Sequence, residues 1–144
     1  MTKPLLAVNN LRIEFPTRRG TLLAVDDVSF SIEAGEILGV VGESGAGKSL
    51  TGSAIIGLLE PPGRIGGGSI ELEGQRIDDL PYEKMRLIRG DRIGAIFQDP
   101  LTSLNPLYQI GRQLTETIQT HTSLTRRQAR ARALDLLREV GIPS

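Results

Sequence analysis

The order of strand-like, loop-like and helical segments predicts an α/β protein. Residues 5–15 and 22–32 alternate apolar with polar side chains, which is typical of half-exposed antiparallel strands. Residues 37–41 are apolar on both faces, as expected of a strand buried in the middle of a sheet. A glycine-rich loop follows them and leads into a helical pattern over residues 48–59.

The rest of the chain adds short strands and then helices. Strand-like spacing occurs again in residues 69–74 and, as a second buried-type strand, in residues 93–97. Helical spacing occurs in residues 82–89, 107–119 and 126–140. Thr125 and Gln128 form a predicted capping box at the start of the last helix, and Gly141 is expected at its end.

Composition excludes several classes of site. Of the 144 residues, 17 are Lys or Arg and 17 are Asp or Glu, so the net charge of zero gives no support for a nucleic-acid partner. Cysteine is absent, which excludes disulfides and thiolate metal sites, and His121 is the only histidine. No apolar run approaches the roughly 20 residues that span a bilayer. Any link to a membrane is therefore expected to come through a partner.

The glycine-rich loop has the residues of a phosphate site, in the order Gly42-Glu43-Ser44-Gly45-Ala46-Gly47-Lys48-Ser49. Its glycines allow the backbone to curl through left-handed conformations, which points successive N–H groups at an anion. The following helix adds its N-terminal dipole. Lys48 can reach the β- and γ-phosphates, and the Ser49 hydroxyl can bind Mg²⁺. The loop therefore predicts binding of ATP or a closely related nucleotide, whereas the Gly-x-Gly-x-x-Gly dinucleotide pattern is absent.

The loop alone fits kinases, GTPases, motor ATPases and transporter ATPases. Together with the preceding run over residues 25–36, it resembles the ATP-binding subunit of ABC transporters. The stretch Ile96-Phe97-Gln98-Asp99-Pro100, followed by Ser103-Leu104-Asn105-Pro106, is similar to the Q-loop region of one branch of that family. That branch imports dipeptides, oligopeptides, nickel and glutathione.

The resemblance implies a P-loop NTPase (RecA-like) core over residues 37–99. An antiparallel β subdomain would precede it in residues 1–36, and a helical subdomain that docks on the membrane subunits would begin in residues 100–144. ATP and Mg²⁺ are the implied cofactors. The implied partners are membrane subunits and a second, identical or related, ATP-binding subunit, at the cytoplasmic face of the inner membrane.

The resemblance also implies individual roles. Lys48 and Gln98 would be the catalytic residues, Ser49 and Gln98 the metal ligands, and Gln98 would also sense the membrane subunits. The residues in contact with nucleotide would be Phe15, Gly42, Glu43, Ser44, Gly45, Ala46, Gly47, Lys48, Ser49 and Leu50. Without the resemblance, a core position is the better interpretation of Phe15, and a solvent-facing strand end is the better interpretation of Gln98. Arg126, Arg127, Arg130 and Arg132 are interpreted as a solvated helix face rather than a phosphate or lipid contact.

Three motifs of the family do not occur in the sequence. They are a Leu-Ser-Gly-Gly-Gln-type signature, four apolar residues ending in Asp-Glu, and a switch histidine. We therefore expect a truncated piece of a longer protein that hydrolyses ATP very slowly or not at all. The first hypothesis is the N-terminal part of an importer ATPase. The alternative is a stand-alone fragment that only holds nucleotide, or only contacts a membrane subunit, without catalysis.

Overall fold

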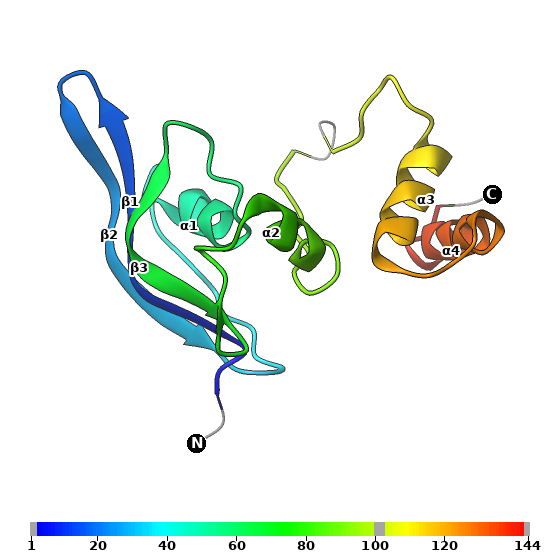
Figure 1. The fold of residues 1–144 in the computed structure, drawn as a ribbon, viewed down its shortest axis with the longest axis horizontal. Coiled ribbons are helices and arrows are strands. Elements are labelled where there is room, and N and C mark those ends of the chain that lie inside the picture. Colours follow the sequence, from blue (N-terminus) through cyan, green and yellow to red (C-terminus); the bar gives the residue numbers. More distant parts are fainter. Residues whose placement is uncertain (1–2, 100–102, 143–144) are drawn as a thin grey trace. The chain divides into compact units, whose positions relative to one another are not determined.

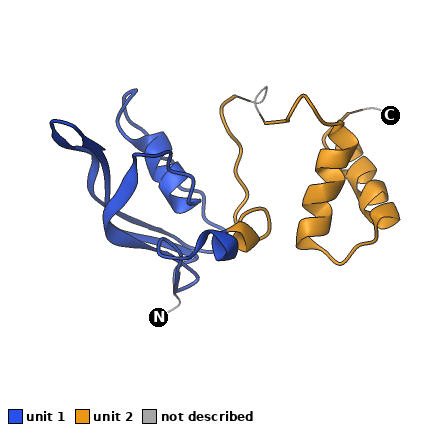
Figure 2. Cartoon of the chain, turned by 45° about the horizontal axis from the view of Figure 1, so that its top comes forward, with its two compact units in different colours: residues 1–85 blue, residues 86–144 orange. Residues whose placement is uncertain are grey.

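The computed structural model describes residues 3–99 and 103–142. The chain forms two compact units, Met1–Met85 and Arg86–Ser144, which Figure 2 shows in different colours. The subdomain boundaries predicted after residues 36 and 99 remain predictions.

The first unit contains a four-stranded antiparallel sheet in the order β2-β1-β3-β4 (Figure 1). The strands are β1 (Leu6–Thr17), β2 (Gly20–Ile32), β3 (Arg64–Leu72) and β4 (Gln75–Arg76). Helix α1 (Lys48–Ile55) contacts β1 and β3. The fully buried side chains of this unit come from β1 and β3, and they are Val8, Leu11, Ile13 and Ile70. The three strands predicted at residues 5–15, 22–32 and 69–74 are confirmed, the last with an earlier start.

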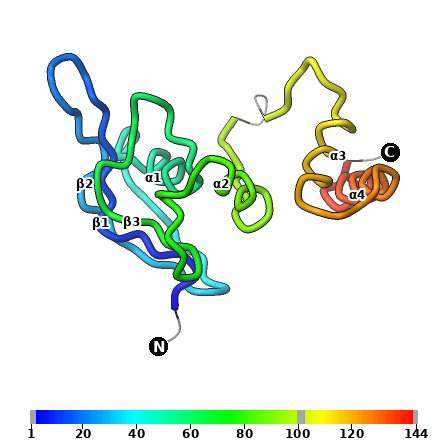
Figure 3. The backbone as a smooth tube through the Cα atoms, in the orientation of Figure 1, coloured from blue at the N-terminus to red at the C-terminus, as the bar shows by residue number. Residues whose placement is uncertain are grey.

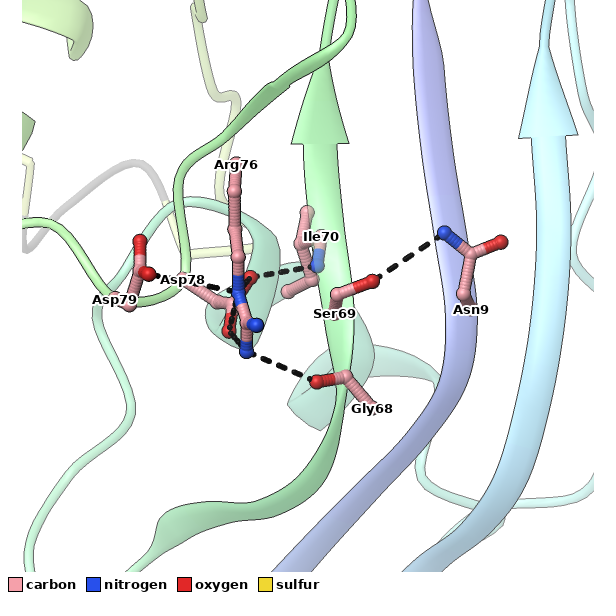
Figure 4. A network of polar contacts seen from close by, with 7 residues as sticks. All are labelled: Asn9, Gly68, Ser69, Ile70, Arg76, Asp78 and Asp79. Carbon is pink, nitrogen blue, oxygen red and sulfur yellow. Dashed lines mark hydrogen bonds and ion pairs between the residues drawn. The ribbon is translucent and has the colours of Figure 1, made fainter.

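The Asp78 carboxylate, which follows β4 in the chain, lies beside the edge of β3 (Figure 4). Asp78 accepts hydrogen bonds from the Ile70 backbone N–H at 2.7 Å and from the Arg76 guanidinium at 2.8 Å. Its side chain is only 5% exposed. Burial opposes ionisation, but the hydrogen bonds and the positive charge of Arg76 outweigh it and hold the pKa of Asp78 below its usual range.

We expect Asp78→Asn to lower the free energy of unfolding by about 2 kcal/mol at neutral pH, because two charge-assisted hydrogen bonds lose their charge. A lowered folded-state pKa stabilises the fold above the ordinary carboxyl pKa of about 4, and this contribution is lost as the pH falls through the lowered value. The wild-type advantage over Asp78→Asn in urea titrations should therefore shrink below about pH 4. Asp79→Asn, at an exposed carboxylate 3.6 Å from Arg76, is the control and should change little. An equal effect of both substitutions would contradict this account.

The two predicted buried strands are wrong for this structure. Residues 37–41 form no strand, and Ile37 and Val41 are 96% and 94% exposed. Residues 93–97 contribute only an isolated parallel bridge between Arg89 and Ile93, and Ile96 is fully exposed. A strand of this type is buried only when other strands pair with it on both sides. Within residues 3–99 and 103–142, no strand pairs with residues 37–41.

The predicted helices are present, with shifted ends. Helix α1 ends at Ile55 instead of residue 59. Helix α2 (Tyr82–Ile88) spans the division between the two units, and α3 (Ile110–His121) and α4 (Arg126–Glu139) pack against each other in the second unit. The capping box of Thr125 and Gln128 at the start of α4 is confirmed. None of the helices in the described part of the chain is long and apolar enough to cross a membrane.

Candidate functional site

The glycine-rich loop lies between residues 37–41 and the start of α1. Gly45 and Gly47 have φ values of 84° and 85°, in the left-handed region that favours glycine. Gly47 is the N-cap of α1 and is buried against β2: a Cβ added there would lie 2.8 Å from Val25 Cγ2 and 3.2 Å from the Ala24 carbonyl oxygen. The loop is therefore anchored to the sheet at the residue that begins the helix.

Lys48 folds back over the loop. Its ammonium group donates hydrogen bonds to the carbonyl oxygens of Gly42 at 2.7 Å and Glu43 at 2.6 Å. The Ala46 N–H also donates to the Glu43 carbonyl at 3.2 Å, which closes a turn inside the loop. An ammonium group has three donors, and two carbonyls use two of them. The positive charge of Lys48 is thus held beside the curled backbone.

The first turn of α1 adds to this positive potential. The first N–H groups of a helix have no intrahelical acceptor, so they point outward with the positive end of the helix dipole. Ser49 and Leu50 lie in this turn, and Ser49 is exposed. The curled loop, the ammonium group and the helix start together suit a multiply charged phosphate with a divalent cation.

Thr51 is a supporting residue that the sequence analysis missed. Its backbone N–H and its hydroxyl both donate to the Gly47 carbonyl, at 2.9 Å and 3.0 Å. This double contact holds the residue at the junction between loop and helix. A hydroxyl side chain four residues after the helix N-cap is the signal that could have identified it.

Phe15 lies in the same unit as the loop. Val25, which contacts Gly47, pairs with Ile13 across β1 and β2. Phe15 pairs with Leu22 in the same two strands, beyond a register shift between Ile13 and Glu14. The ring is partly exposed. Its stacking on a base remains a prediction.

The remaining predicted residues belong to the second unit. Gln98 is exposed in a bend, and its roles as metal ligand and catalytic residue remain predictions. Residues 100–102 lie outside the described residues, and they include Leu101 and Thr102 from the stretch predicted to dock on membrane subunits. The arginines of α4 that were interpreted as a solvated face, at positions 126, 127, 130 and 132, are exposed, and Arg132 forms an ion pair with Glu139 at 2.7 Å. Among residues 3–99 and 103–142, no group of three or more His, Cys, Asp or Glu side chains could hold a metal ion.

The family model described as ABC transporter matches residues 25–144. The chain belongs to the ABC transporter family. This confirms the resemblance noted from the loop and from the Gln98 stretch. The individual relatives described below are peptide-transport proteins, which agrees with the peptide-importer branch that the sequence indicated.

Several curated relatives that match this chain are ATP-binding proteins of peptide transport. The chain is 42% identical over 139 residues to the dipeptide transport ATP-binding protein DppD of Escherichia coli (strain K12), covering 96% of this chain and 42% of the relative. It is 45% identical over 139 residues to the oligopeptide transport ATP-binding protein OppD of Salmonella typhimurium, covering 96% and 41%. Against OppD of Bacillus subtilis (strain 168) it is 45% identical over 140 residues, covering 96% and 39%. The chain thus spans about two fifths of the length of these relatives.

A solved ABC cassette has the same fold. The post-hydrolysis dimer of the ATP-binding cassette MJ0796, bound to ADP and Pi, superposes with a TM-score of 0.78 at 24% identity, covering 92% of this chain and 56% of that one. This confirms the predicted fold class, a P-loop NTPase core with an antiparallel β part and the first helices of a helical part.

Proposed function

We propose that the chain is the nucleotide-holding part of an ABC importer ATPase that powers uptake of peptides or a related small solute, such as nickel or glutathione. The preformed loop is the observation that carries this proposal. It combines two left-handed glycines, a buried helix N-cap and a lysine ammonium group within hydrogen-bonding distance of the loop carbonyls.

Each predicted residue has a role in this proposal. Lys48 and the N–H groups of the loop bind the phosphates of ATP, and Phe15 stacks on the base. Ser49 and Gln98 bind Mg²⁺, which when present offsets the negative charge of the phosphates. The fit of Ser49 rests on its exposed position in the first turn of α1, next to Lys48.

The solute class and the partners are also proposals. The names of DppD and OppD, which transport dipeptides and oligopeptides, support a peptide as the solute. The dimeric state of the MJ0796 cassette supports a second ATP-binding subunit as partner. We place the protein at the cytoplasmic face of the inner membrane, where it would be held by membrane subunits of the transporter.

Magnesium-dependent ATP binding tests the proposal, by calorimetric titration of the chain with ATP in Mg²⁺ and in EDTA. We expect Mg²⁺ to tighten binding about tenfold in the wild type and much less in Ser49→Ala, because a ligand of the cation is lost. Ser53→Ala, one turn further along α1, is the matched control and should behave as the wild type. Absence of ATP binding by the wild type, or full Mg²⁺ dependence in Ser49→Ala, would refute the assignment.

A further inference from the structure

A tight turn between α1 and β3 presses against the ring of Phe15. The Gly63 N–H donates to the Glu60 carbonyl at 2.8 Å, which closes this turn. A Cβ added to Gly63 would lie 2.7 Å from Cε1 and 2.9 Å from Cζ of Phe15, and 2.9 Å from the Glu60 carbonyl oxygen. These separations are shorter than real Cβ contacts allow. Any side chain at position 63 must therefore displace the ring, the turn or both.

An ion pair joins the residue before Phe15, Glu14, to the residue after Gly63, Arg64. Arg64 donates to Glu14 Oε1 through Nε at 2.8 Å and Nη2 at 2.7 Å. The two residues also face each other in the register of β1 and β3. The Glu14 side chain is 23% exposed and the Arg64 side chain is 64% exposed, so this pair is partly solvated. It fixes the backbone of the turn beside Phe15 independently of the glycine contact.

The same turn is joined to the phosphate loop through a short piece of chain. Helix α1 begins at Lys48, inside the loop, and ends at Ile55. Residues 56–63 then lead to β3, a path that Figure 3 follows from the α1 label into the green strand. A single continuous segment therefore carries the phosphate-binding groups at one end and the support of the aromatic ring at the other.

We propose that Gly63 is a positioning residue for the nucleotide base, which keeps the Phe15 ring in the orientation that stacks on adenine, with the Arg64–Glu14 pair as its clamp. The inference rests on the proposed function, in which Phe15 stacks on the base of ATP. The turn would therefore affect how tightly the base is bound, whereas the affinity for the phosphates would depend on the loop alone.

Comparison of ATP with inorganic tripolyphosphate separates the two contributions, because tripolyphosphate carries the phosphates without a base. The ratio of its dissociation constant to that of ATP measures the contribution of the base and the ribose together, and the change of this ratio in Phe15→Ala isolates the part due to stacking. Stacking of a base on an aromatic ring contributes about fivefold to 150-fold in affinity, so Phe15→Ala should lower the ratio by a factor in that range, about tenfold. We expect Gly63→Ala to lower the ratio about fivefold with little change in tripolyphosphate affinity. Gly111→Ala, where an added Cβ meets nothing within 4 Å, is the control.

The double variant Phe15→Ala/Gly63→Ala tests whether the glycine acts through the ring, and we expect no further loss beyond Phe15→Ala. If Phe15→Ala leaves the ratio unchanged, base stacking by Phe15 is wrong and the inference falls with it. If Phe15→Ala lowers the ratio and Gly63→Ala does not, stacking stands and the positioning role is overturned. An equal loss of ATP and tripolyphosphate affinity in Gly63→Ala also overturns it.

Arg64→Gln provides a second test that introduces no steric clash, and it decides the matter if Gly63→Ala fails to fold. Loss of the clamp should lower the ratio about twofold to threefold and leave tripolyphosphate affinity unchanged. Arg18→Gln, at an exposed arginine in the turn after β1, removes the same charge as a control. An unchanged ratio in a folded Arg64→Gln protein would overturn the proposed clamp.

Discussion

Lys48→Met should weaken ATP binding by about 100-fold or more. Methionine keeps the apolar stem of the side chain but removes the ammonium group, which now donates to the carbonyls of Gly42 and Glu43. The substitution therefore releases the start of the loop, and under the proposed function it also removes a charge-assisted contact to the phosphates. A hydrogen bond to a charged group contributes about 1.5–3 kcal/mol, and the loss of loop order adds to this.

Calorimetric titration with ATP measures this effect, and Lys84→Met is the matched control. Lys84 is an exposed residue of α2, and its replacement removes the same charge from the same unit. We expect its ATP affinity to stay within about twofold of the wild type, since an exposed charge away from the site contributes little. If Lys48→Met and Lys84→Met bind ATP equally well, the loop is not the nucleotide site.

Local signals explain which parts of the fold could be predicted. Alternation of side chains identified β1 and β2, and the capping box identified the start of α4, because each depends on residues close together in sequence. Residues 37–41 have the composition of a central strand, yet in the structure they are exposed. Composition indicates that such a segment needs neighbours, but only pairing with other strands makes it a strand. The same holds for residues 93–97.

The candidate site also has one part that depends on residues close together in sequence and one part that depends on contacts between distant residues. The loop is contiguous, so its glycines, Lys48 and Ser49 were recognisable from spacing alone. The contact between Gly63 and Phe15 could not be predicted, because it depends on the register that places β3 beside β1 and on the turn after α1. Gly63 follows two prolines and therefore looks like an ordinary helix stop in the sequence. Its close approach to the ring is visible only in three dimensions.

Gly47→Ala should damage both the fold and the site. Alanine at φ 85° is strained, and its Cβ would lie 2.8 Å from Val25 Cγ2. Relief of the clash must move the N-cap of α1 away from β2, and the loop moves with it. We expect the free energy of unfolding to fall by about 2–4 kcal/mol in urea titrations. ATP affinity should fall more than tenfold, because the N–H groups of the loop lose their common direction.

Gly52→Ala in the same helix provides a control of opposite sign. An added Cβ at Gly52 meets nothing within 4 Å, and the position is exposed in the interior of α1. Alanine there should raise the free energy of unfolding by about 0.5–1 kcal/mol and leave ATP affinity unchanged. If Gly47→Ala is as stable as Gly52→Ala and binds ATP as the wild type does, the loop does not need the anchor on β2. If Gly47→Ala loses ATP affinity but keeps the stability of the wild type, the contact between Gly47 and β2 matters only for the shape of the loop. The sheet would then tolerate a displaced helix α1.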